Sequence, residues 1–164
     1  MNNVSVSVKN AAGNSASAAQ DVRVDTSCPT VTINTIAGDD ILNAAEAGQP
    51  LTISGMVIGA EAGQTVTVSL GGKNYTTTVK ADGSWLLDVA ANNVGALTNG
   101  NVIVTAKVAD KAGNEGSSSH NLLVDTSAPG ITIATVAGDN IINATEHAQE
   151  QVIRGSTTNA VVGD

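Results

Sequence analysis

Hydrophobic and polar residues alternate with a period of two along much of this chain. The run Val4-Ser5-Val6-Ser7-Val8 is the clearest, and residues 102–108 repeat it in weaker form. Successive side chains of a β-strand point to opposite faces, so this alternation predicts strands with one buried face. Between residues 27 and 126 the pattern predicts seven strands, near 30–36, 50–58, 64–70, 73–80, 84–89, 101–109 and 117–124.

Turn residues separate the predicted strands. Gly71-Gly72 is typical of a tight hairpin turn, and Ala81-Asp82-Gly83 indicates another. The stretch 90–100 has room for a single helical turn at most, and no convincing long helix is present. Short β-rich strands separated by such turns predict an all-β fold, an immunoglobulin-like β-sandwich of about seven strands.

The chain is also repetitive, with a period of 100 residues. Val24-Asp25-Thr26-Ser27-Cys28-Pro29 returns as Val124-Asp125-Thr126-Ser127-Ala128-Pro129, and 27–55 and 127–155 agree at 15 of 29 positions. A unit this long exceeds the roughly 20–45 residues of a solenoid repeat and suits an independently folding domain. We therefore predict the C-terminal part of one repeat (1–26), a complete repeat (27–126) and the N-terminal part of a third (127–164).

A chain that starts and stops inside repeats is expected to be a piece of something longer. Its two flanks lack the remaining strands of their sandwiches. We expect them to be poorly protected from hydrogen exchange, or paired between molecules.

Composition narrows the functional classes. Hydrophobic residues make up 41% of the chain but include one Trp and no Phe, so we expect a small aliphatic core around Trp85. The formal net charge of −8 disfavours nucleic acids and anionic membranes as partners. No apolar run approaches the roughly 18 residues of a membrane span, and no secretory signal is visible. Cys28 is the single cysteine, and Ala128 replaces it in the next repeat.

Several motifs occur in a fixed order. They are the D-T-S-x-P linker, a G-D-[DN]-x-[IL]-N-A-x-E loop, G-x-x-Y-T-T-T-V-x-A-D-G-S-W and A-D-K-A-G-N. Together they resemble the bacterial Ig-like repeats of giant Bap-like, biofilm-associated adhesins, which type I secretion exports from Gram-negative bacteria. The resemblance covers the whole chain. It implies a many-domain stalk on the cell surface, with calcium bound at domain junctions.

The sandwich topology gives an independent argument for calcium. The loop between strands 30–36 and 50–58 should lie at the same end as the exit linker, and the loop around residues 110–114 should lie beside the entering linker. A full junction would then combine the first of these loops from one repeat, the linker, and the second of these loops from the following repeat. Calcium takes six to eight oxygen ligands, and no shared histidine or thiol suggests zinc. The candidate ligands are Asp25, Asp39, Asp40, Asn43, Glu46, Asp110, Asn114, Asp125 and Thr126, with Asp139, Asn140, Asn143 and Glu146 in the partial third repeat.

The same residues have a simpler interpretation, because Asp, Asn and Gly are ordinary turn residues. The density of acids favours a metal. Three or four carboxylates within ~6 Å would cost several kcal/mol without a cation, even at an effective dielectric constant near 20. Each junction in this chain is incomplete, and Asn10 stands where the next repeat has Asp110.

We therefore expect a structural spacer outside the cell, stiffened by calcium at its junctions. Its partners would be the adjacent repeats, with a host surface or biofilm matrix bound by other parts of the full protein. The alternative is a module that binds carbohydrate or host protein. Such a module would be expected to carry a cluster of exposed aromatic residues, and the whole chain has only two aromatic residues. An enzyme is not expected, because no nucleophile, base and orienting group can be assembled. His120 and His147 are not shared between repeats, because Gln20 and Ala47 are their counterparts, so we expect both to be surface residues.

Overall fold

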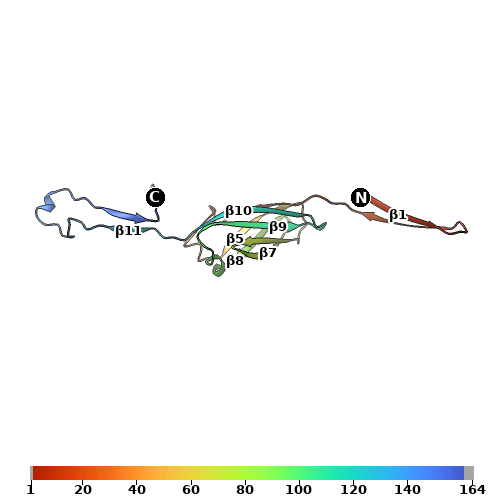
Figure 1. Ribbon diagram of the computed structural model, residues 1–164, viewed down its shortest axis with the longest axis horizontal. Helices are drawn as coiled ribbons and strands as arrows, with labels where there is room; N and C mark the ends of the chain where they lie inside the picture. Colours follow the sequence, from red (N-terminus) through yellow and green to blue (C-terminus); the bar gives the residue numbers. More distant parts are fainter. Residues whose placement is uncertain (1, 161–164) are drawn as a thin grey trace. The chain divides into compact units, whose positions relative to one another are not determined.

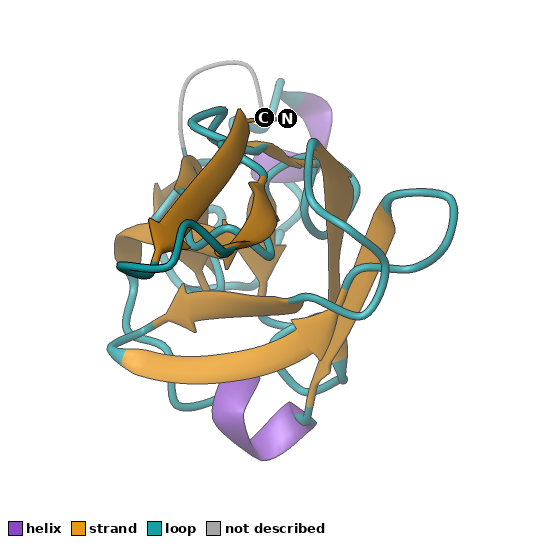
Figure 2. Ribbon diagram, turned by 90° about the vertical axis from the view of Figure 1, so that its right-hand side faces the viewer, coloured by secondary structure: helices purple, strands orange, loops and turns teal. Residues whose placement is uncertain are grey.

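The computed structural model describes residues 2–160, and β-strands predominate in it (Figures 1 and 2). The strands are β1 (Asn2–Lys9), β2 (Ser15–Val22), β3 (Thr30–Ile33), β4 (Ile41–Asn43), β5 (Leu51–Ile58), β6 (Thr65–Leu70), β7 (Lys73–Thr78), β8 (Ser84–Val89), β9 (Gly100–Ala109), β10 (Glu115–Asp125), β11 (Gly130–Ile133) and β12 (Gly155–Thr158). One helical turn, α1 (Ala91–Val94), and a short 3-10 helix, η1 (Glu146–Ala148), complete the described elements.

Two antiparallel-rich sheets form the central region. One has the strand order β3-β5-β8, and the other has the order β4-β10-β9-β6-β7. All seven strands expected between residues 27 and 126 are present, and α1 is the expected single turn. The predicted immunoglobulin-like β-sandwich is therefore confirmed. Strand ends differ modestly, since the strand expected at 30–36 ends at Ile33 and the one expected at 73–80 ends at Thr78.

β4 is the one element of the sandwich that the sequence pattern did not predict. It pairs in parallel with the end of β10, with Ile41, Leu42 and Asn43 opposite Leu123, Val124 and Asp125. Three residues are too few for a period-two pattern to be visible. The strand is instead stabilised by tertiary packing, because Leu42 is completely buried between two exposed neighbours.

The residues group into two compact units by their internal contacts. The first comprises residues 1–34, 52–87 and 103–121, and the second comprises 35–51, 88–102 and 122–164. The aliphatic core of the first unit includes the inward-facing residues Ile53, Val66, Val68, Val104 and Ala106. That of the second includes Ile36, Leu42, Val94, Leu122 and Val124.

Trp85 occupies the core of the first unit, as expected, with 1% of its surface exposed. A Cβ atom at Gly55 would meet the indole carbons Cε2 and Cζ2 at 2.8 Å, and also the carbonyl oxygen of Thr32. Position 55 is therefore restricted to glycine because the indole ring lies against the β5 backbone. The indole Nε1 has no hydrogen-bond partner among the described residues.

The two flanks form separate hairpins, β1 with β2 and β11 with β12. Val4, Val6 and Val8 of β1 are 59–69% exposed, whereas their counterparts one period later are buried in β9. Ile131 and Ile133 of β11 are similarly exposed, at 80% and 72%. These faces thus carry core-type residues without a covering sheet among the described residues. Their poor protection from hydrogen exchange remains a prediction.

Candidate functional site

The acidic loop, residues 35–46 of the second unit, is held together by its own polar side chains. The Oδ1 atom of Asp40 accepts a hydrogen bond from the backbone N–H of Ile36 at 2.8 Å, and the Oδ1 atom of Asp39 accepts one from Ile41 at 3.0 Å. Asn43 and Glu46 bond reciprocally. The Asn43 Oδ1 atom accepts from the Glu46 N–H at 3.1 Å, and the Glu46 Oε2 atom accepts from the Asn43 N–H at 3.1 Å. This exchange resembles a capping box, and it orders the turn.

Residues 135–146, one 100-residue period later, build the same loop. Asn140 replaces Asp40 and accepts from Val136 at 3.0 Å, while Asp139 accepts from Ile141 at 2.9 Å. Asn143 and Glu146 repeat the reciprocal pair at 3.1 and 3.0 Å. An amide oxygen therefore serves as well as a carboxylate at position 40 or 140. The loop geometry is encoded locally, by short-range hydrogen bonds.

Pairing of β4 with β10 brings the acidic loop to the exit linker. Asn43 lies opposite Asp125, and the backbone N–H of Leu123 donates to the carbonyl oxygen of Asp40 at 2.9 Å. Of the candidate ligands, Asp39, Asp40, Asn43, Glu46 and Asp125 thus belong to adjoining segments of the second unit.

Asn99 contacts the linker as well, and sequence reasoning missed it. Its Oδ1 atom accepts hydrogen bonds from the backbone N–H of Thr126 at 3.2 Å and from the Thr126 hydroxyl at 2.8 Å. Its Nδ2 atom donates to the hydroxyl of Ser127 at 2.8 Å. The 100-residue period gave no signal, because the chain contains no second copy of position 99.

A second group of candidate ligands lies in the first unit, where the β9–β10 turn meets the entering linker. Both Asp110 carboxylate oxygens accept from Asn114, Oδ1 from its backbone N–H and Oδ2 from its side-chain Nδ2, each at 2.9 Å. The same Nδ2 atom donates to the carbonyl oxygen of Asp25 at 3.2 Å. The structure thus brings Asp25, Asp110 and Asn114 together, with an amide N–H donor between the two acceptors.

The environment of Asp110 favours its charged form. Hydrogen bonds from the Asn114 side chain, and then from nearby backbone N–H groups, lower the pKa of the Asp110 carboxyl below its ordinary value of 3.8 although its burial opposes the shift. Because the unfolded state binds the proton first as pH falls, the stabilisation by Asp110 is complete above pH ~4 and is lost below it.

We expect Asp110→Asn to flatten the acid limb of the stability profile, measured by urea unfolding between about pH 6 and pH 2. Asparagine already occupies the equivalent position 100 residues earlier, where Asn10 accepts from the Asn14 N–H at 3.0 Å, so the turn should be retained. Identical pH profiles for the parent and the variant would contradict this role of Asp110.

The expected crowding of carboxylates is not found in residues 2–160. No three His, Cys, Asp or Glu side chains there are grouped so that they could share a metal ion. Asp39, Asp40 and Glu46 each direct one oxygen toward a backbone N–H of their own loop. The side-chain atoms available as metal ligands are still all oxygens, which suit calcium better than zinc.

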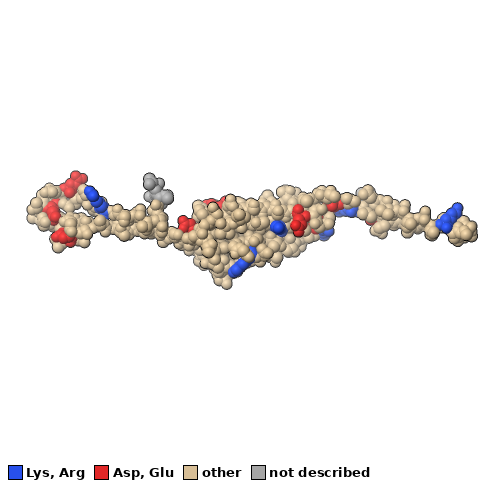
Figure 3. Space-filling view, in the orientation of Figure 1, with Lys and Arg blue, Asp and Glu red and all other residues tan. Residues whose placement is uncertain are grey.

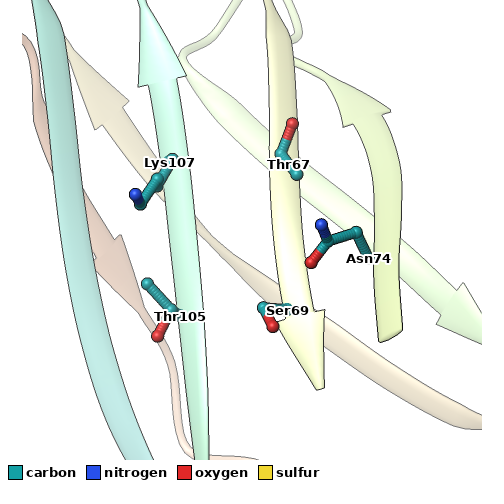
Figure 4. A pocket seen from close by; sticks show the side chains of 5 residues that line it. All are labelled: Thr67, Ser69, Asn74, Thr105 and Lys107. Atoms are coloured by element: carbon teal, nitrogen blue, oxygen red, sulfur yellow. The ribbon is translucent and has the colours of Figure 1, made fainter. Parts of the chain in front are cut away.

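The outer face of β6, β7 and β9 carries a polar hollow of about 430 Å³. Figure 4 shows that Thr67, Ser69, Asn74, Thr105 and Lys107 line it. On the face drawn in Figure 3, basic side chains lie in separate patches rather than in a continuous stripe. Among the described residues, no helix is long and apolar enough to cross a membrane.

Comparison with known proteins places these features in context. Residues 43–126 match the sequence profile of the bacterial Ig-like domain. A structure from a 1.5-MDa bacterial ice-binding adhesin, studied for its retention at the host cell surface, is 33% identical over 96% of this chain, with a TM-score of 0.53. A single bacterial immunoglobulin-like domain from the M. primoryensis ice-binding adhesin is 38% identical, with a TM-score of 0.50, and covers 60% of this chain.

A third structure is of a Ca²⁺-stabilized adhesin that helps an Antarctic bacterium to reach out and bind ice. It is 34% identical over 96% of this chain, with a TM-score of 0.49. The chain spans 40% of the length of that structure and 52% of the length of the 1.5-MDa adhesin fragment. Among curated proteins, none matches this chain.

Proposed function

The chain belongs to the bacterial Ig-like domain family, and from that premise we propose that it is a spacer segment in the stalk of a giant bacterial surface adhesin. The observation that carries the proposal is the linker phrase, residues 24–29 and 124–129, which recurs at a period of 100 residues on either side of a complete sandwich. A tandem array of such domains extends a protein while keeping each core independent. In this role the chain acts outside the cell, and other parts of the longer protein contact a host surface or biofilm matrix after type I secretion.

We further propose that residues 27–126 are one complete domain, with parts of its neighbours at 1–26 and 127–164. The domain from M. primoryensis supports this division, because 98% of its length aligns with 60% of this chain. The linker phrase bounds the proposed domain on both sides.

Calcium bound at the junctions is the proposed stiffening device. The acidic loop and Asp125 would supply ligands from one repeat, and the β9–β10 turn of the next repeat would supply counterparts of Asp110 and Asn114. A divalent cation would neutralise these carboxylates and tie the two repeats together. Support comes from the oxygen-only donor set and from β4, which brings the acidic loop to the linker. Pro29 and Pro129 add stiffness through their fixed φ.

Two complete tandem repeats are expected to melt at a higher temperature in calcium than in chelator. Extracellular calcium modules bind at about 10⁻⁴–10⁻³ M, so 10 mM calcium should add about 1.4–2.7 kcal/mol of stability. For a domain of this size, that corresponds to a rise of several degrees in Tm. Differential scanning calorimetry measures it, with equimolar magnesium as the control ion. A shift of a degree or less would favour the simple turn interpretation of the acidic loop.

A second candidate function is carbohydrate binding at the polar hollow. Hydroxyl and amide groups beside Lys107 are suited to a polyhydroxylated ligand. A glycan array probed with the whole chain tests this function. Glycan binding would support this function if Lys107→Ala or Thr67→Ala abolished it. If no glycan bound, the spacer role would be the one remaining proposal.

A further inference from the structure

The two copies of the linker phrase are contacted by different parts of the central domain. We propose that every linker is held by both of the repeats that it joins, through hydrogen bonds that need no metal ion. The proposal rests on the tandem arrangement in the proposed function, and it adds an interaction surface for the neighbouring repeat that is independent of calcium. Within residues 2–160, each copy of the phrase displays one half of this double contact.

The contact from the preceding repeat is seen at Thr126 and Ser127. Asn99 uses both ends of its amide, accepting from the Thr126 N–H and hydroxyl at 3.2 and 2.8 Å and donating to the Ser127 hydroxyl at 2.8 Å. Three hydrogen bonds from one short side chain define both the position and the rotation of the linker backbone. Asn99 precedes Gly100, whose φ of 121° is in the region that favours glycine, so the chain can turn there into β9.

The contact from the following repeat is seen at Asp25. Asn114 donates from Nδ2 to the Asp25 carbonyl oxygen at 3.2 Å. Asp110 determines where that donor points, because its carboxylate accepts from both the backbone and the side chain of Asn114 at 2.9 Å. Asp110 is only 8% exposed. It is therefore a positioning residue, and Asn114 is the residue that contacts the linker.

The two contacts are compatible on a single linker because they use different atoms. The preceding repeat contacts the Thr N–H and the Thr and Ser hydroxyls, whereas the following repeat contacts the Asp carbonyl oxygen. The Asp side chain is occupied by a third, internal bond. Its Oδ1 atom accepts from the Ser N–H at 3.2 Å in one copy and 3.0 Å in the other. All of these bonds can coexist, which explains the Asp-Thr-Ser order of the phrase.

The test measures backbone ¹⁵N relaxation of the full chain in EDTA and again in millimolar calcium. In EDTA the parent should give order parameters near 0.85 for the Thr126 and Ser127 amides, as for rigid backbone. Asn99→Ala should lower them below about 0.6, while Asn114→Ala should lower that of the Thr26 amide instead. Asn92→Ala, in the exposed face of α1, is the control and should change neither. Core amides such as that of Val104 report whether each variant is folded.

A conservative variant separates this role from a general effect on folding. Asn99→Asp keeps both contacts, because the second carboxylate oxygen can accept from the Ser127 hydroxyl in place of the amide donor, so Thr126 and Ser127 should both stay ordered. The proposal is overturned if Asn99→Ala leaves the linker rigid, or if the parent linker is mobile in EDTA and ordered only by calcium. The latter outcome would leave the calcium proposal intact. Conversely, a linker that is rigid in EDTA, in repeats whose melting calcium does not change, would support this inference and remove calcium from the proposed function.

Discussion

Replacing Trp85 with alanine is expected to lower the free energy of unfolding by about 3–5 kcal/mol, the usual range for a fully buried large aromatic residue. Trp85 is 1% exposed and is the only tryptophan in a core that otherwise consists of small aliphatic side chains. The β5 backbone at Gly55, against which the indole ring lies, has no side chain with which to fill the space. Urea unfolding followed by far-ultraviolet circular dichroism measures the change, since the variant lacks its fluorophore.

Leu86 provides the matched control for this variant. It follows Trp85 on β8, points to the opposite face and is 40% exposed. Leu86→Ala should cost about 1–2 kcal/mol, less than Trp85→Ala, because its side chain is smaller and only partly buried. Equal losses of stability from the two substitutions would show that the indole ring does not anchor this core.

The sequence pattern located the sandwich because most of its strands are long enough to alternate. β8 was expected at 84–89 and lies there, bounded by a glycine turn and by α1. β4 escaped detection because its three residues are specified by what they pack against. Leu42 is buried by tertiary contacts, whereas the nearby residues Asp39, Asp40 and Asn43 are of types that are common in turns. The alternation of hydrophobic and polar residues thus predicts strands such as β8. It does not reveal a strand such as β4, whose formation depends on packing against residues far away in the sequence.

The candidate site was predictable in position but not in chemistry. Sequence reasoning expected Asp25, Asp110 and Asn114 to meet, and hydrogen bonds connect them in the structure. It could not say whether oxygens in the acidic loop accept N–H groups or bind a cation, since the same Asp and Asn residues suit both. Asn99 was invisible for a different reason. A lone polar residue in an irregular stretch carries no pattern, and its contact with Thr126 depends on the fold.

Leu42→Ala should lower the free energy of unfolding by about 2–5 kcal/mol and should also release the acidic loop from the linker. Leu42 is completely buried, and it is the central residue of the β4–β10 pairing that sets Asn43 opposite Asp125. Loss of this anchor should expose the backbone hydrogen bond from Leu123 to the Asp40 carbonyl oxygen. Hydrogen exchange of the Leu123 amide reports the local release, and urea unfolding reports the global loss.

Ile41→Ala is the control, because Ile41 lies in the same strand with 41% of its surface exposed. It should cost less than about 1 kcal/mol and leave the Leu123 amide protected. If calcium is bound by the acidic loop and the linker together, Leu42→Ala should also reduce the calcium-dependent rise in Tm of tandem repeats, whereas Ile41→Ala should preserve it. A Leu42→Ala protein that retains the full calcium response would place the ligands within the acidic loop alone, since pairing of β4 with β10 would then contribute nothing to the site.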